Sequence, residues 1–224
     1  MRRIGIIMIV GLLFVTGVFS FTSQVYGQGA KKVLMIPREG FSTDLDLMIK
    51  MEVGVMTILL KRAGFEWDIA TTSGQPILGP TQKIEKVARL SEIKLDNYVG
   101  VIMPCMAVGM FPGPPVSPET VAIVKKSLSD GKPVAAAANA SIILAEAGLL
   151  KGKKYTFATD PLKPTGQWTR TDLRFEGAIY SGPGVIQDGK IITSGICPNL
   201  ERVLAMPNGT IELTHKFIAL LGPK

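Results

Sequence analysis

Histidine and cysteine are scarce in this 224-residue chain, which has one histidine, His215, and two cysteines, Cys105 and Cys197. A single histidine excludes a multi-histidine metal site and leaves few bases for histidine-dependent catalysis. Two cysteines are too few for a disulfide scaffold, although an even number permits one bridge in an oxidising compartment. We therefore expect neither a metal nor a cofactor.

Long basic runs, internal repeats and a second long hydrophobic stretch are also missing. The formal net charge is +7, but the lysines occur in scattered pairs such as Lys31-Lys32 and are not interleaved with aromatic residues. This pattern gives no support to a nucleic-acid partner. The absence of a 20–50-residue repeat argues against a solenoid, and a single hydrophobic run argues against a polytopic membrane protein.

The one long hydrophobic run lies at the start of the chain and has the pattern of a secretory signal. Arg2 and Arg3 precede an uncharged stretch over residues 4–21, and small residues, Val25 and Gly27, follow at the spacing of a cleavage site. The alternative is an uncleaved N-terminal anchor, because 18 apolar residues nearly suffice to cross a bilayer. Both readings predict export, to the periplasm or the medium. Residues 1–27 are thus expected to be a signal peptide or anchor, and residues 28–224 a single domain.

Apolar runs alternate with helical patterns through the remaining 197 residues. Buried strands are predicted at 33–37, 66–71, 98–103 and 133–137, and a hairpin with an Asp188-Gly189 turn at 185–192. Helices are predicted after the first strand, with Leu45, Met48, Val55, Ile58 and Leu59 on the buried face, and at 118–130, 142–147, 200–206 and 210–221.

Strands that alternate with helices indicate an α/β fold with a mostly parallel sheet covered on both faces. Ligand sites in such sheets lie at the carboxyl ends of the strands. The segments to examine are therefore 38–44, 104–110, 138–141 and 194–198.

The sequence resembles the ThiJ/PfpI superfamily, the DJ-one group related to class I glutamine amidotransferases, over roughly residues 31–222. The residues that carry the resemblance are Gly131-Lys132-Pro133-Val134-Ala135-Ala136, the segment 142–154, Ala70 to Pro76, Tyr98 to Pro104 and Asp188 to Ser194. The resemblance implies a three-layer α/β/α sandwich of flavodoxin-like type, often assembled as a homodimer or larger homo-oligomer.

The residues that would carry the superfamily's chemistry are replaced in this chain. Its nucleophilic cysteine stands on a strand-to-helix turn, where this chain has Ala138 followed by Asn139. An alanine has no thiol to ionise, and an asparagine cannot shuttle a proton near neutral pH. The resemblance puts Ser42 where a glutamate is expected, and Cys105-Met106 where two glycines supply oxyanion donors. Three replacements at one site indicate loss of the ancestral reaction.

The two cysteines border the same predicted pocket and leave three alternatives open. They form a disulfide across its mouth, which requires Cα atoms within about 7 Å. Alternatively, Cys105 is a relocated nucleophile or redox thiol, or both are buried inert thiols. The predicted pocket consists of Ser42, Cys105, Met106, Ala138, Asn139, Asp160 and Cys197.

Other candidate residues have ordinary explanations. His215 fits a terminal amphipathic helix and is not expected to be catalytic. Trp168, Arg170, Arg174 and Phe175 lie in an irregular insert, 164–176, that suits a binding lid or an oligomer contact equally well.

Two functions follow from these residues. The first is a non-catalytic, exported domain that binds a small molecule or a protein partner at the former active-site cleft, with a membrane involved only if the N-terminal segment stays uncleaved. The second is a divergent hydrolase or glyoxalase-type enzyme that uses Cys105.

Overall fold

A seven-stranded sheet forms the centre of the computed structural model, which describes residues 31–40, 42, 44–106, 115–165 and 170–222. The strand order is β10-β11-β7-β6-β1-β2-β5, and every strand is parallel to its neighbours except β10, which is antiparallel to β11. The sheet strands are β1 (Lys32–Met35), β2 (Glu66–Thr71), β5 (Ala88–Arg89), β6 (Tyr98–Met103), β7 (Val134–Ala137), β10 (Val185–Asp188) and β11 (Ile191–Ser194).

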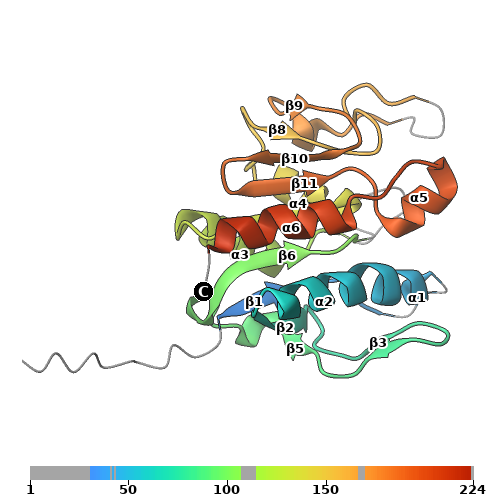
Figure 1. Ribbon diagram of the computed structural model, residues 1–224. Helices are drawn as coiled ribbons and strands as arrows, with labels where there is room; N and C mark the ends of the chain where they lie inside the picture. The colour runs from blue at the N-terminus through green and yellow to red at the C-terminus, as the bar shows by residue number, and fades with distance from the viewer. Residues whose placement is uncertain (1–30, 41, 43, 107–114, 166–169, 223–224) are drawn as a thin grey trace, which may run out of the picture.

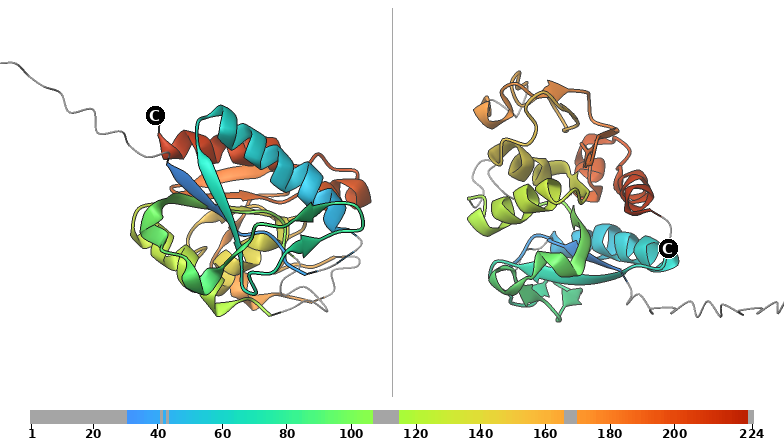
Figure 2. Two further views of the ribbon diagram at one scale, coloured as in Figure 1. Left: turned by 90° about the horizontal axis from the view of Figure 1, so that it is seen from below. Right: turned by 90° about the vertical axis from the view of Figure 1, so that its left-hand side faces the viewer.

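Helices cover both faces of this sheet, and four short strands form two separate two-stranded sheets (Figures 1 and 2). The α-helices are α1 (Leu45–Met48), α2 (Gly54–Arg62), α3 (Pro118–Ser129), α4 (Ser141–Glu146), α5 (Pro198–Leu204) and α6 (Thr210–Leu221). The π-turn η1 (Ile49–Val53) joins α1 to α2, and 3-10 turns occur at η2 (Leu90–Glu92), η3 (Leu95–Asn97), η4 (Ala138–Ala140) and η5 (Leu173–Phe175). The short strands are β3 (Ile77–Leu78), β4 (Lys83–Ile84), β8 (Lys154–Tyr155) and β9 (Ile179–Tyr180).

The apolar core consists of two clusters, one on each face of the sheet. On one face, Met35 and Ile102 pack in the cluster that includes Leu60 of α2 and Phe217 of α6. On the other face, Leu34 of β1 belongs to the cluster with α3 and α4. Neighbouring residues of β1 point to opposite faces, and both faces are buried, so the strand reads as a continuous apolar run. The predicted three-layer α/β/α sandwich is confirmed.

Local signals placed most of the elements correctly. The Ser117 hydroxyl accepts a hydrogen bond from the backbone N–H of Thr120 at 3.2 Å, so the predicted cap begins α3. The predicted hairpin is present as the antiparallel pair β10 and β11. Within the described part of the chain, no helix is long and apolar enough to cross a membrane; the predicted signal over residues 1–27 lies outside that part.

The predicted buried face of the first helical segment is wrong at its C-terminal half. Ile58 is 54% exposed, whereas Met56 and Leu60 are fully buried. The buried stripe is Leu45, Met48, Glu52, Met56 and Leu60, at spacings of three and four residues, so it continues through the π-turn η1 to Met56 and not to Val55 and Ile58. The same stripe carries the acidic side chain of Glu52 into the protein, where the residue is 0% exposed.

The strand-to-helix turn after β7 has an unusual backbone. Ala137 ends the strand with an extended conformation, and Ala138 then adopts φ +46° before α4 begins. An L-residue in this left-handed region costs about 1–2 kcal/mol, and alanine lacks the polar side chain that helps asparagine or aspartate adopt it. The sequence therefore keeps a strained corner at the position where the resemblance places the nucleophile.

This strain predicts how glycine substitutions will behave along the turn. Ala138→Gly relieves the left-handed strain, which offsets the lost methyl packing and the greater chain entropy of glycine in the unfolded state. Ala140 is equally buried but has φ −62°, so Ala140→Gly has no strain to relieve. In urea unfolding we expect Ala138→Gly to be about 1–2 kcal/mol more stable than Ala140→Gly. Equal losses in the two variants would contradict a strained corner at residue 138.

Candidate active site

Three loops at the carboxyl ends of neighbouring strands meet at the Ala138 turn. Cys105 lies two residues beyond β6, Asn139 follows Ala138 after β7, and Cys197 precedes α5 in the loop after β11. The Asn139 N–H and the Cys197 side chain both lie close enough to the Cys105 sulfur to shift its pKa, the N–H downward and the second thiol upward. The structure thus brings together Cys105, Asn139 and Cys197 from the predicted set, with both cysteines as free thiols.

Cys197 is the thiol whose ionised form the surroundings favour. The hydrogen bond from the Cys105 side chain lowers the pKa of Cys197 to about 7, against the opposing effect of burial. The nearby backbone N–H groups of Leu200 and Asn199, at the start of α5, lower the pKa of Cys197 further. Cys197 is fully buried, so a negative charge on this sulfur is held inside the protein.

The surroundings of Cys105 favour its protonated thiol instead. The hydrogen bond to Cys197, burial of the thiol and the charges of Cys197 and Glu52 raise its pKa well above the ordinary value, and only the Asn139 N–H opposes them. Part of the residue reaches solvent, although the thiol itself is densely surrounded. Cys105 is therefore the hydrogen-bond donor of the pair, and Cys197 is the acceptor.

Glu52 supplies a buried carboxyl group to the same site. Its Oε1 accepts a hydrogen bond from the backbone N–H of Cys105 at 2.9 Å, while its Oε2 has no hydrogen-bond partner among the described residues. Burial raises the pKa of Glu52 well above the ordinary value, and the charge of Cys197 raises it further, against smaller effects of the Cys105 N–H and Arg38. The carboxyl is consequently held in its neutral form more readily than a solvated one.

The acid expected near residue 42 comes from Glu52 instead, which corrects the sequence interpretation. The Ser42 hydroxyl hydrogen-bonds to the carboxylate of Asp44, which also pairs with the Arg38 guanidinium. Ser42 thus belongs to a surface network, and the site has kept an acid. The available signal was the spacing of Leu45, Met48, Glu52, Met56 and Leu60, which places one charged residue in an otherwise apolar stripe.

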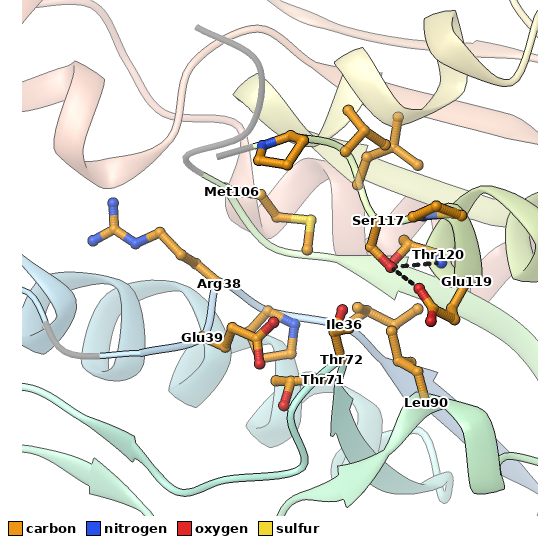
Figure 3. A pocket seen from close by; sticks show the side chains of 15 residues that line it. Ile36, Arg38, Glu39, Thr71, Thr72, Leu90, Met106, Ser117, Glu119 and Thr120 are labelled. Carbon is orange, nitrogen blue, oxygen red and sulfur yellow. Dashed lines mark hydrogen bonds between the residues drawn. The ribbon is translucent and has the colours of Figure 1, made fainter. Parts of the chain in front are cut away.

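A cavity of about 440 Å³ lies beside this cluster, at the ends of β1 and β2 and the start of α3. Met106 is the one predicted pocket residue that lines it. In Figure 3, Glu39 and Thr71 lie on one side and Ser117, Glu119 and Thr120 on the other, with Met106 between them. The Glu39 carboxylate accepts the Ser73 N–H at 2.9 Å, and Ser117 donates to Glu119 at 2.8 Å.

The remaining candidates lie elsewhere. Asp160 closes a turn by accepting the Leu162 N–H at 3.0 Å and does not line the cavity. His215 is exposed on α6. Within the insert, Trp168 lies outside the described residues, Arg174 pairs with Asp172 and Glu146, and the buried Phe175 ring packs against Tyr155 and Phe157. Among the described residues, no group of three side chains is arranged to hold a metal ion.

Because the Glu52 carboxyl is buried, we expect Glu52→Gln to increase the stability of the protein in a pH-dependent way. Because the folded-state pKa of Glu52 lies above its unfolded value, wild-type stability falls as pH rises from about 4.5 through the folded pKa. Glutamine can still accept the Cys105 N–H but cannot ionise. The variant should therefore gain stability relative to wild type with rising pH, by up to about 1.4 kcal/mol per pH unit, in urea unfolding between pH 4 and 9.

The matched control for this measurement is Glu92→Gln, which changes an exposed glutamate in η2. Its stability difference from wild type should stay flat across the same pH range, because that side chain faces solvent. A flat difference for Glu52→Gln as well would contradict a buried, neutral carboxyl at the site.

Comparison with known proteins agrees with this architecture. The DJ-1/PfpI family pattern matches residues 31–203. The chain is 28% identical over 199 residues to the uncharacterized protein MJ0967 of Methanocaldococcus jannaschii, covering 87% of this chain and 89% of that protein. It is 29% identical over 165 residues to a protein of Thermococcus kodakarensis named Deglycase TK1284, covering 73% of this chain and 89% of that protein.

Solved structures show the same fold at low sequence identity. A ThiJ/PfpI domain protein from Brachyspira murdochii superimposes with a TM-score of 0.61 at 15% identity, over 86% of this chain and 98% of the other. DJ-1beta of Drosophila melanogaster superimposes with a TM-score of 0.59 at 21% identity, over 88% of this chain and 92% of the other. With the family pattern spanning most of its length, this chain belongs to the DJ-1/PfpI family.

Proposed function

We propose that this protein is a DJ-1/PfpI domain that has lost thiol attack from the strand-to-helix turn and binds a small ligand in the adjacent cavity. The observation that carries the proposal is the Ala138 turn, which keeps its left-handed backbone with a methyl group in place of a nucleophile. Removing a nucleophile normally costs orders of magnitude in rate. We further propose, from residues 1–27, that the domain acts outside the cytoplasm.

The hydrogen-bond donor next to the turn supports this proposal. In enzymes built on such a turn, the backbone N–H of the residue after the nucleophile stabilises the oxyanion that forms during attack. Here the Asn139 N–H already donates to the Cys105 sulfur. A substrate carbonyl would have to displace that sulfur, so the attacking atom and a free oxyanion donor are both missing from the turn.

The chemistry of the cavity indicates the kind of ligand. Its apolar lining includes Ile36, Leu90, Met106 and Ile143. Its polar lining consists of two carboxylates, Glu39 and Glu119, several hydroxyl groups and the Arg38 guanidinium, whose charge is paired with Asp44. Carboxylates and hydroxyl oxygens accept hydrogen bonds. This combination suits a small molecule with an apolar body and hydroxyl or ammonium groups, and a volume of about 440 Å³ is in the range of ordinary ligand sites.

The alternative, a hydrolase or glyoxalase-type enzyme that uses Cys105, has less support. Attack on a carbonyl needs a thiolate and a separate oxyanion donor; here interaction with Cys197 and burial raise the pKa of Cys105, and the Asn139 N–H at the turn faces the Cys105 sulfur itself. One relative is named a deglycase, which makes an α-oxoaldehyde the appropriate substrate for a test.

We expect purified wild-type protein not to consume methylglyoxal above the buffer rate. The double variant Ala138→Cys/Cys105→Ala returns a thiol to the turn and frees the Asn139 N–H, so it should gain thiol-dependent consumption of at least about tenfold over wild type. The measurement is the loss of methylglyoxal over time, with Cys105→Ala alone as control. Wild-type turnover that disappears in Cys105→Ser would instead establish the Cys105 enzyme.

Ligand binding is tested by filling the cavity. Thr72 lines it and is exposed, so Thr72→Trp should occlude it without disturbing the core, whereas Thr171→Trp changes an exposed threonine outside it. In a thermal-shift screen of small polyols and amines, a ligand at 100 times its Kd should raise Tm by about 5–10 °C. The shift should vanish in Thr72→Trp and persist in Thr171→Trp. Shifts that survive Thr72→Trp would place binding elsewhere.

A further inference from the structure

The two thiols come from loops on either side of the Ala138 strand. In the sheet, β7 lies between β6, which leads to Cys105, and β11, which leads to Cys197. The N–H of Asn139 on the central loop bonds to Cys105, and Cys105 bonds to Cys197. A thiol–thiol contact therefore forms at the turn where the family nucleophile is missing.

The backbone holds both cysteines in place. The Cys105 N–H is bonded to the buried Glu52 carboxyl at 2.9 Å. On the other loop, the Gly195 N–H bonds to the carbonyl of Gly184 at 2.9 Å, and a Cβ at position 195 would lie 2.5 Å from the Pro183 carbonyl oxygen. Two fixed loops whose thiols lie close enough to shift each other's pKa meet the first condition for forming a disulfide.

Glu52 provides a second, independent sign that this cluster is functional. Its residue is 0% exposed, its Oε2 has no hydrogen-bond partner among the described residues, and it is introduced by a π-turn, a feature frequent at functional sites. A buried polar atom without a partner costs stability. The Cys105 N–H bonds to Oε1, so the unpartnered Oε2 is not explained by that structural contact.

We propose that Cys105 and Cys197 are a redox dithiol that exchanges with small-molecule disulfides, such as oxidised glutathione. The activity is separate from ligand binding in the cavity, which neither cysteine lines. The two proposals can therefore fail independently.

The exchange runs in two balanced steps. The pair first loses a proton and rests with the thiolate on Cys197; when the remaining proton then moves from Cys105 to Cys197, the Cys105 sulfur becomes the thiolate that attacks. A Cys105–S–S–R bond forms, the substrate disulfide breaks, and RS⁻ leaves with the electron pair. Cys197 then loses its proton and attacks the Cys105 sulfur, which releases the second RS⁻. The two protons lost by the cysteines are taken up by the two leaving thiolates, so the dithiol is oxidised and the disulfide is reduced to two thiols.

The order of attack follows from exposure and environment. The Cys105 residue is partly exposed, although its sulfur is densely surrounded, and Cys197 is fully buried, so Cys105 lies nearer than Cys197 to an external disulfide. The backbone N–H groups of Asn199 and Leu200 lower the pKa of Cys197, which favours its thiolate as the second, internal attacker.

The test is a redox titration of the full wild-type protein in buffers of reduced and oxidised glutathione. Aliquots are alkylated and analysed by intact and peptide mass spectrometry. We expect one two-electron transition in which both thiols disappear together, with the loss of two hydrogen atoms and a Cys105–Cys197 cross-linked peptide. Wild-type protein that stays fully reduced under oxidising conditions, or accumulates only mixed disulfides with glutathione, would overturn the proposal.

Single variants assign the roles. Cys197→Ser should form a stable mixed disulfide at Cys105, because the resolving thiol is gone. Cys105→Ser should be modified at Cys197 at least about tenfold more slowly than wild type loses its thiols, because Cys197 is buried. Equal rates for Cys105→Ser and wild type would overturn the assigned order. Alanine variants at both positions repeat the measurement if a serine disturbs folding.

An ordinary exposed thiol provides the matched control. Ser129 is exposed on α3, so Ser129→Cys in the Cys105→Ser/Cys197→Ser background presents a single surface cysteine without a neighbour. This variant should form only a mixed disulfide, with a one-thiol dependence on glutathione. If wild-type protein follows the same curve as this variant, the paired mechanism is wrong.

Discussion

The left-handed turn at Ala138 is the constraint on which the arrangement of the site depends. It ends β7 abruptly and starts α4, which aims the N–H of Asn139 at the space above the sheet edge. In enzymes with a nucleophile at such a turn, the N–H of the next residue stabilises the oxyanion of the substrate. Here this N–H acts on the Cys105 sulfur instead, and the Cys197 side chain is the second neighbour of that sulfur. The backbone of the site is thus preserved while its sulfur comes from the two flanking loops.

Electrostatics then divides the roles of the three ionisable groups. A fully buried carboxyl and a buried thiolate disfavour each other, which is why the charge of Cys197 raises the pKa of Glu52. Backbone N–H groups reach Cys197, whereas a single N–H reaches the Cys105 sulfur. The negative charge is therefore most stable on Cys197, and burial together with this charge favours the protonated forms of Glu52 and Cys105.

Sequence patterns predicted the fold and much of the site, for identifiable reasons. Apolar strands such as Val33–Ile36 and capping residues such as Ser117 act locally, so the three-layer sandwich and the start of α3 followed directly. The position of Ala138 at a strand-to-helix corner came from the resemblance. Glu52 was missed because a charged residue is expected on the solvent face of a helix, although its spacing from Met48 and Met56 places it on the buried face. The different behaviour of the two thiols depends on backbone N–H directions that no sequence pattern specifies.

The account is tested most directly by the ultraviolet absorbance of thiolate in the folded wild-type protein as a function of pH. It predicts one thiolate per molecule that appears with a midpoint near pH 7, the value to which hydrogen bonding lowers the pKa of Cys197. That transition should be lost in Cys197→Ala and shifted to higher pH in Cys105→Ala, because the lowering depends on the Cys105 hydrogen bond. Two thiols that ionise together at the pH of a free cysteine, about 8.5, would contradict the account.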